Sequence, residues 1–241
     1  MNASPTSSAW LRTVPLAHRG LCAGAGEDLP AENSLAAFGR SVASGVGCEL
    51  DVRLTRDGVP VVVHDPVVVA TDGRRWRVGR LAVAEVERFG IPTLAAALDV
   101  LRDGPVMLEL KQPSPRVGAL EAAVLDVLLR SGRSLDRVVV ASFNPWTVAW
   151  FARHAPSLPR ALTVSRVATR TVLSRGVLRW TRPHALSVAV TVVGGRRVRR
   201  LRADRAVLCW TVRGEEDLGR ARRFADAVIF EGDPTTFGVA A

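Results

Sequence analysis

Short apolar runs alternate along the chain with longer amphipathic stretches. The runs are rich in β-branched residues and nearly continuous in apolar character, which is typical of strands covered on both faces. Alternation of such strands with helical stretches predicts a β/α architecture with a mostly parallel sheet. The runs lie at 14–17, 47–53, 59–64, 106–110, 137–142, 160–164, 185–189, 206–211 and 227–230.

These nine runs are one too many for an eight-stranded barrel, and the run at 59–64 has a different explanation. Asp57-Gly58 stands just before it, and this dipeptide between strands is a strong signal for a hairpin turn. A parallel return would need about a dozen or more connecting residues. We therefore interpret this run as an antiparallel extension of the second strand. The other eight runs predict an α/β fold, a closed (β/α)8 TIM barrel with a β-hairpin extension after the second strand.

Polar residues that favour helix N-caps precede three of the amphipathic stretches. They are Ser34 before 35–46, Thr93 before 94–101 and Asn144 before 146–153. Between the hairpin and the second of these helices, 66–80 contains Thr71-Asp72-Gly73 and reads as a surface loop. The order of the predicted elements therefore agrees with one barrel along the chain.

Composition narrows the class of protein. The 241 residues are 48% apolar and 23% charged, which excludes a disordered or fibrous chain and predicts a single domain over 1–241. Cys22, Cys48 and Cys209 are far apart, so neither a disulfide framework nor a zinc ribbon is expected. The sequence has neither an apolar run of membrane-spanning length nor the apolar core of a signal peptide, and we expect a cytoplasmic protein.

Basic residues dominate the charge. The formal net charge is +10, and every basic residue except Lys111 is an arginine. This balance favours anionic partners, although the arginine excess is also what a coding bias would produce. The arginine-rich stretch 196–202 predicts a solvent-exposed helix. The stretch 166–182 mixes arginines with apolar residues and Trp180, a composition that suits an anionic membrane surface.

Charged residues gather where the predicted strands end, which is where barrels of this type build their active sites. Glu49 and Asp51 are two apart in one strand, so their side chains share a face, and we expect this face to be the barrel interior. Glu109 lies in the run at 106–110 and Lys111 directly follows this run, so their side chains share a face in the same way. A hairpin centred near Asp57 brings His64, which ends the run at 59–64, beside these carboxylates.

Three inward carboxylates would repel one another strongly unless a cation neutralised them. Oxygen ligands suit one divalent ion of the hard class, Mg²⁺ or Ca²⁺, with Mn²⁺ as a further candidate, better than Zn²⁺. His18 and His64 suit general acid and base catalysis, and Arg19 and Lys111 suit an anionic substrate group. The combination points to phosphoryl-transfer chemistry.

The motifs also resemble those of a known family, the glycerophosphodiester phosphodiesterases. The similarity is carried by LAHRG (16–20), AENS (31–34), ELDV (49–52), TRDGVPVVVHD (55–65), IPTL (91–94), LELK (108–111) and CWTV (209–212). This resemblance implies a metal-dependent hydrolase on a (β/α) barrel. Its substrates would be glycerophosphodiesters, the deacylated phospholipids, which it would cleave to sn-glycerol 3-phosphate and an alcohol.

The resemblance also implies a role for each matching residue. The metal ligands would be Glu49, Asp51 and Glu109, the acid/base pair His18 and His64, and the phosphate-neutralising groups Arg19 and Lys111. Glu32 matches an acid of the family motif, and we expect it to lie around the metal ligands without binding the metal. Trp210 and Phe143 would form an apolar wall for the glycerol carbons. Alternatively, Trp210 packs in the core beneath the mouth of the barrel.

Other functions stay open on the sequence. A lysophospholipase D-type phosphodiesterase could work at a membrane surface and use 166–182 as its docking element. A non-catalytic binder of anionic lipid or nucleic acid is a third interpretation, although we expect no nucleic-acid partner. The segments 66–71 and 230–234 depart from the family pattern, which leaves the substrate preference undefined. The native metal, the oligomeric state and the choice between direct water attack and a cyclic phosphate are also open.

Overall fold

Eight parallel strands close into a barrel in the computed structural model, which describes residues 9–22, 29–166 and 169–237. The first strand, β1, pairs in parallel with both the second and the last strand of the ring, so the sheet has no free edge within the barrel. This confirms the predicted (β/α)8 fold. In ring order the strands are β1 (Leu16–His18), β2 (Gly47–Leu54), β6 (Val106–Leu110), β7 (Val138–Ser142), β8 (Arg160–Val164), β9 (Ala185–Ala189), β10 (Ala206–Val212) and β11 (Ala227–Phe230).

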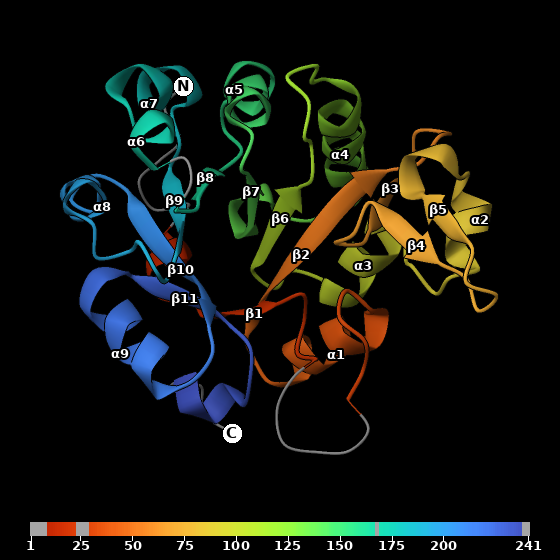
Figure 1. Ribbon diagram of the computed structural model, residues 1–241, viewed down its shortest axis with the longest axis horizontal. Helices are drawn as coiled ribbons and strands as arrows, with labels where there is room; N and C mark the ends of the chain where they lie inside the picture. The colour runs from red at the N-terminus through yellow and green to blue at the C-terminus, as the bar shows by residue number, and fades with distance from the viewer. Residues whose placement is uncertain (1–8, 23–28, 167–168, 238–241) are drawn as a thin grey trace.

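Helices form the layer around the barrel (Figure 1). The three predicted caps are confirmed, because the side chains of Ser34, Thr93 and Asn144 each accept a hydrogen bond from the first turn of the helix that follows. The first helix ends earlier than predicted, since Gly45 turns the chain with a φ of +67°. The helices are α1 (Leu35–Ala43), α3 (Leu94–Leu101), α4 (Ala119–Arg130), α5 (Pro145–His154), α6 (Thr169–Val172), α7 (Arg175–Thr181), α8 (Arg196–Leu201) and α9 (Glu215–Phe224).

The core has an inner part inside the barrel and an outer part between strands and helices. Side chains such as Met107 and Leu208 fill the interior together with Trp10 and Leu11 of the 3-10 helix Ala9–Arg12. The indole nitrogen of Trp10 donates a hydrogen bond to the carbonyl of Asp136, just before β7 begins. The amino-terminal end of the barrel is therefore sealed, which leaves the carboxyl-terminal end as the mouth.

The predicted hairpin extension is present. β3 (Pro60–Val62) pairs antiparallel with β2, with Val52 opposite Val62. Gly58 adopts a φ of +81° in the turn, a conformation that favours glycine. The hydroxyl of Thr55 donates to the Asp57 carboxylate and so closes the turn with a side-chain hydrogen bond.

The prediction of a plain surface loop over 66–80 was wrong. This segment forms a second hairpin of β4 (Val67–Val69) and β5 (Arg75–Arg77), followed by a 3-10 turn (Val78–Arg80) and α2 (Val83–Glu87). These strands have three residues each, too few for a clear alternation of polar and apolar positions. The missed signal was Asp72-Gly73, the same type of turn dipeptide as in the first hairpin.

Three further expectations concern the arginine-rich helix, the cysteines and membrane-spanning segments. α8 exposes its arginines and buries Val198, so the predicted solvent-exposed arginine helix is confirmed. Cys22, Cys48 and Cys209 are all free thiols. Within the ranges that the structure describes, no helix has the length and apolar character needed to cross a membrane. The first eight residues of the expected leaderless N-terminus lie outside those ranges.

Candidate active site

The three predicted carboxylates meet at the mouth of the barrel because their strands pair in register. Asp51 on β2 stands beside Glu109 on β6, and Glu49 on β2 stands beside His18 on β1. Glu49 and Asp51 are 2% and 1% exposed. Each of the three carboxylates offers an oxygen within 4.8 Å of the others, a spacing that a single metal ion could bridge. Their gathering in one place agrees with the sequence prediction, while their role as ligands stays a prediction.

Two cations lie against this cluster. The ammonium group of Lys111 is 2.8 Å from Asp51 Oδ1 and also contacts Glu109. Arg19 places its Nε 3.1 Å from Asp51 Oδ2, and its backbone N–H donates to Glu49 at 3.2 Å. Arg19 has a φ of +57°, an unusual backbone conformation for a residue with a side chain. The predicted cationic groups therefore lie in the same site as the carboxylates.

The electrostatics of the cluster fit a metal site. Burial raises the pKa of Glu49 well above its usual value, and the charges of Asp51 and Glu109 raise it further. Burial also raises the pKa of Glu109, although Lys111 opposes the effect. For Asp51, burial is outweighed by Lys111, Asn33 and Arg19 together, and its pKa falls below the usual value. Three carboxylates thus face two cations, and the all-oxygen donor set suits Mg²⁺ or Ca²⁺.

His18 is held by the last strand of the barrel. Its Nδ1 lies 2.6 Å from Oε1 of Glu231, directly after β11, and its Nε2 lies 3.9 Å from Glu49. The Arg213 guanidinium donates two hydrogen bonds to the Glu231 carboxylate. The hydrogen bond from His18 is the largest cause that lowers the pKa of Glu231 to about 2. The ionised Glu231 therefore orients the ring so that Nε2 faces the carboxylate cluster.

His64 comes two residues after the end of β3. Its Nδ1 is 2.8 Å from Oδ1 of Asp65, and 37% of its side chain is exposed. The guanidinium group of Arg53 donates two hydrogen bonds to the His64 carbonyl, which fixes the backbone there. Both histidines thus bind a carboxylate through Nδ1, which leaves Nε2 available for proton transfer.

Glu32 and its neighbour support the cluster from outside. Glu32 binds the Arg19 guanidinium at 2.7 Å, and Arg19 in turn contacts Asp51, while its role outside the ligands stays a prediction. Asn33 donates to Asp51 Oδ2 at 2.9 Å and accepts a hydrogen bond from the Asp51 backbone at 3.3 Å. The amide therefore fixes the orientation of one carboxylate.

The two predicted wall residues contact each other. The rings of Phe143, directly after β7, and Trp210, on β10, meet edge to face with centroids 5.5 Å apart. The Lys111 ammonium lies 6.0 Å from the Phe143 ring. Phe143 is 41% exposed, and the buried indole N–H of Trp210 has no hydrogen-bond partner among the described residues. An exposed ring and a free donor beside the cation suit a substrate wall better than core packing alone.

Three residues of the site were missed from the sequence alone: Glu231, Arg213 and Asn33. Glu231 directly follows the last strand and Arg213 directly follows β10, so the rule that barrel sites lie at strand ends would have found both. Asn33 was treated with Ser34 as part of a helix cap. Its contact with Asp51 depends on a left-handed backbone, with a φ of +55°, that a polar pattern does not reveal.

Barrel and site together define a class of protein, the barrel enzymes that act on phosphate esters. Residues 18–231 match the Glycerophosphoryl diester phosphodiesterase family. The chain is 30% identical over 253 aligned positions to the probable glycerophosphodiester phosphodiesterase 1 of Mycobacterium tuberculosis, covering 89% of this chain and 87% of that protein. The chain therefore belongs to this family of phosphodiesterases, which confirms the resemblance drawn from the motifs.

Solved structures agree on the fold. A crystal structure of a putative glycerophosphoryl diester phosphodiesterase from Silicibacter pomeroyi superposes with a TM-score of 0.81 at 23% identity, covering 97% of this chain and 96% of that chain. A phosphodiesterase from Oleispira antarctica, in complex with the product sn-glycerol-3-phosphate, gives a TM-score of 0.77 at 23% identity, with 92% and 94% covered. The barrel is thus shared over nearly the whole length of these proteins.

Proposed function

We propose that this phosphodiesterase hydrolyses glycerophosphodiesters to sn-glycerol 3-phosphate and an alcohol, with a divalent cation and two histidines. The observation that carries the proposal is the convergence of Glu49, Asp51, Glu109, His18 and Lys111 at one mouth. Membership of the family supports the reaction class. The product bound to the Oleispira protein supports the substrate class.

Glu49, Asp51 and Glu109 would hold the cation. When bound, a hard divalent ion supplies positive charge to a phosphoryl oxygen and lowers the energy of the charged transition state. Lys111 and Arg19 add fixed positive charge beside the three carboxylates. Neither side chain has to move during the reaction, because carboxylates already hold both of them.

A cytoplasmic location and a single barrel domain over 1–241 stay predictions.

The two histidines would move the protons. One Nε2 accepts the proton of the attacking hydroxyl as its oxygen forms a bond to phosphorus, and the other Nε2 donates a proton to the alcohol oxygen as the P–O bond breaks. Water is the reactant that balances the overall reaction, whether it attacks first or opens a cyclic phosphate made by the glycerol hydroxyl. Glu231 and Asp65 stabilise whichever imidazole carries the positive charge.

The test is the release of sn-glycerol 3-phosphate from glycerophosphocholine and glycerophosphoethanolamine by purified protein. EDTA-treated protein should be inactive, and Mg²⁺ or Ca²⁺ should restore the release. No release with any of these ions from folded protein would overturn the proposal. Turnover that is insensitive to EDTA would overturn the metal dependence alone.

A second candidate function is contact with an anionic membrane surface. Trp146 on α5 and Trp180 on α7 are 49% and 39% exposed, and their rings meet edge to face with centroids 4.6 Å apart. Arg175 and Arg179 are exposed on the same short helix as Trp180. Paired exposed indoles beside arginines suit an interface with anionic lipids. Residues 167–168 of the predicted docking stretch lie outside the described ranges.

Sedimentation with anionic and with neutral vesicles tests this contact. Binding that requires anionic lipid, weakens at high salt and is lost in the Trp180→Ala variant would support it. Equal binding to neutral vesicles, or unchanged binding by Trp180→Ala protein, would contradict it.

A further inference from the structure

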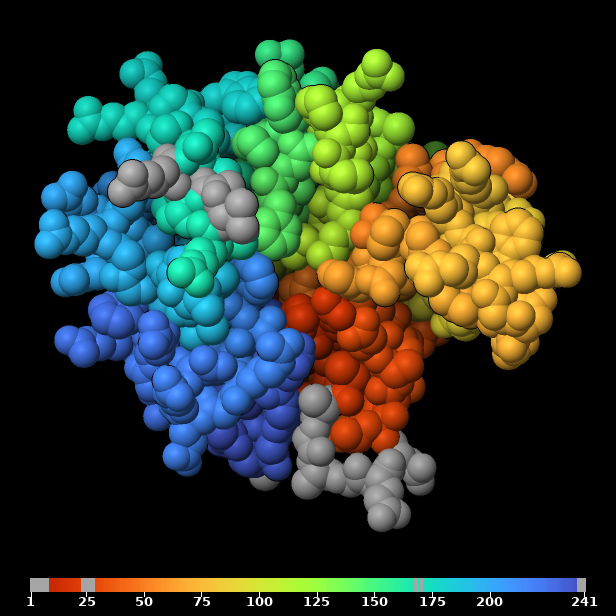
Figure 2. Space-filling view, in the orientation of Figure 1, coloured from red at the N-terminus to blue at the C-terminus, as the bar shows by residue number. Residues whose placement is uncertain are grey.

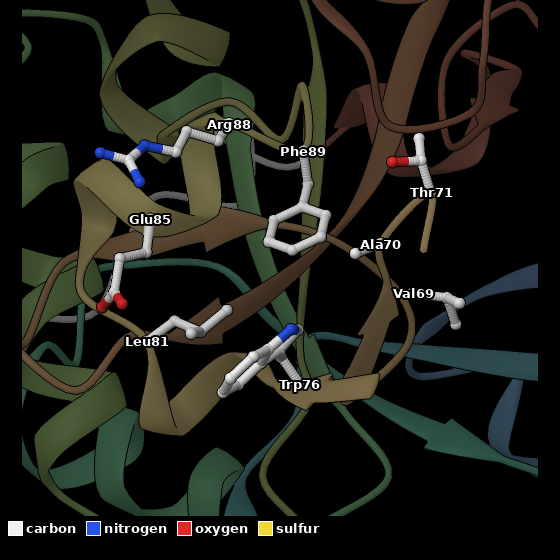
Figure 3. A pocket seen from close by; sticks show the side chains of 8 residues that line it. All are labelled: Val69, Ala70, Thr71, Trp76, Leu81, Glu85, Arg88 and Phe89. Carbon is white, nitrogen blue, oxygen red and sulfur yellow. The ribbon is translucent and has the colours of Figure 1, made fainter. Parts of the chain in front are cut away.

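A pocket of about 530 Å³ lies outside the barrel mouth, in the lobe formed by β4, β5 and α2. Figure 3 shows the rings of Phe89 and Trp76 facing the pocket, with Glu85 and Arg88 toward one end. Its volume falls within the range of about 300–1,000 Å³ that is usual for small-molecule sites. The apolar lining consists of Val69, Ala70, Trp76, Leu81 and Phe89.

Packing accounts for Leu81 and Phe89, which belong to a small core cluster, but not for Trp76. Trp76 is 44% exposed and Val69 is 58% exposed, although both are large and apolar. The lobe projects from the side of the barrel in Figure 2, where its surface meets solvent. An exposed tryptophan beside a hollow is a feature of ligand grooves. The lobe therefore presents an apolar surface for a ligand.

The pocket lies next to a hollow at the candidate active site. A second hollow of about 410 Å³ is lined by His64 and Asp65 and shares Val69 and Phe89 with the first. Trp76 pairs with Val68, which is only four residues beyond His64. The chain can span at most about 14 Å over those four residues. A hydrocarbon chain that starts beside His64 can thus follow β4 into the apolar pocket.

The order of the strands decides which part of the substrate faces the lobe. Phe143 and Trp210, the proposed wall for glycerol, come from β7 and β10, which flank β8 and β9. Of these two strands, β9 stands opposite β2 in the ring of eight, and the β3 hairpin is attached to β2. When glycerol lies against the aromatic wall, the alcohol on the other side of the phosphate faces His64 and the lobe.

We propose that the pocket binds a hydrocarbon chain carried by the leaving alcohol, so that the preferred substrates are glycerophosphodiesters of amphipathic alcohols. The inference rests on the proposed function and adds the substrate class. Trp76 and Phe89 would cover the chain and remove it from water, which is the source of the added affinity. Small polar alcohols leave the pocket empty and are cleaved without this contribution.

The experiment compares glycerol phosphodiesters of ethanol, butanol and octanol in the metal-loaded enzyme. We expect kcat/KM for release of sn-glycerol 3-phosphate to rise with chain length, by up to about fourfold for each buried CH₂ group. In the Trp76→Ala variant, kcat/KM should no longer depend on chain length, and the rate on the ethanol ester should equal that of the wild type. Leu129→Ala, which removes a side chain that is 65% exposed on α4, is the matched control and should keep the series.

The outcomes separate the two proposals. If none of the esters is cleaved, the proposed function itself fails. If all are cleaved at equal rates, or if the series persists in Trp76→Ala protein, the pocket does not bind the chain and the reaction stands. A fourth ester carries a hexanoyl chain on the glycerol instead. If that chain gives the Trp76-dependent gain, the assignment to the leaving alcohol is overturned.

Discussion

Glu231 accepts a hydrogen bond from His18 at 2.6 Å and thereby joins the last strand of the barrel to the first. The contact follows from ring closure, because Ala17 and Phe230, the residues just before them, are paired between β1 and β11. His18 can therefore point Nε2 at the carboxylate cluster only when the barrel has closed. Its orientation, and with it the proposed chemistry, depends on a contact between residues that are far apart in sequence.

Replacing Glu231 should impair catalysis more than folding. Glu231→Gln keeps the hydrogen-bond acceptor but removes the charge that stabilises a protonated His18, and we expect kcat to fall by about 10- to 100-fold. Steady-state turnover of glycerophosphocholine checks this. Asp233→Asn, which alters an exposed acid two residues further on that binds Thr235, should leave kcat unchanged. Equal kcat values for wild type and Glu231→Gln would show that His18 needs no charged partner.

Metal binding should be visible without any substrate. A cation that binds only the folded protein adds about 2.7 kcal/mol at 100 times its Kd, which for a chain of this size raises Tm by about 5–10 °C. Differential scanning fluorimetry with Mg²⁺ or Ca²⁺ measures the shift. Glu49→Gln should reduce it sharply. Asp126→Asn, an exposed acid on α4, should retain the full shift. A shift that is unchanged in Glu49→Gln protein would place the ion elsewhere.

Gly20 should resist substitution for a steric reason. It has a φ of +82°, and a Cβ there would lie 2.8 Å from the Ala37 Cβ. Gly58 has a φ of +81°, but a Cβ at this position would meet nothing within 4 Å, so it isolates the backbone cost. We expect Gly58→Ala to lose about 1 kcal/mol of unfolding free energy and Gly20→Ala to lose about 1–3 kcal/mol more. Urea denaturation measures both, and equal losses would contradict the steric account.

His184 should make stability depend on pH. Burial, together with the charge of Arg160, lowers the pKa of His184 to about 4. In the unfolded chain it titrates near pH 6.5, so between about pH 6.5 and 4 the unfolded state binds a proton that the folded state does not. Unfolding free energy should therefore fall as pH drops through this window, by at most about 1.4 kcal/mol per pH unit from this group.

The His184→Asn variant tests that pH dependence. Asparagine can still accept the hydrogen bond that the Arg160 backbone donates to the ring, but it does not titrate. Urea denaturation at several pH values should give a shallower slope for the variant between about pH 6.5 and 4. Parallel slopes for the two proteins would show that His184 does not titrate differently on folding. Carboxylates that titrate in both proteins cancel in the comparison.

The sequence was sufficient for the barrel and for the three carboxylates that gather at its mouth. Strand order follows from apolar runs, and a spacing of two residues puts Glu49 and Asp51 on one face whatever the rest of the fold does. Parallel pairing then aligned Asp51 with Glu109, as the strand-end argument required. These features are set by local periodicity, and periodicity is visible in a single chain.

What escaped prediction depends on contacts between distant segments or on very short elements. Glu231 reaches His18 only through closure of the ring, and Asn33 reaches Asp51 only through a left-handed backbone. The β4–β5 hairpin has strands too short to show alternation, and the pocket beside Trp76 arises from how that hairpin folds against α2. Tertiary placement decides each of these, and no local pattern encodes it.

The central claim is that two histidines beside an acidic metal cluster cleave the phosphodiester. The most direct test measures glycerophosphocholine turnover by His18→Asn protein at saturating Mg²⁺, beside the metal-induced rise in Tm of the same sample. The account predicts a loss of at least about 100-fold in kcat with the rise in Tm intact. Wild-type turnover by the His18→Asn protein would contradict it.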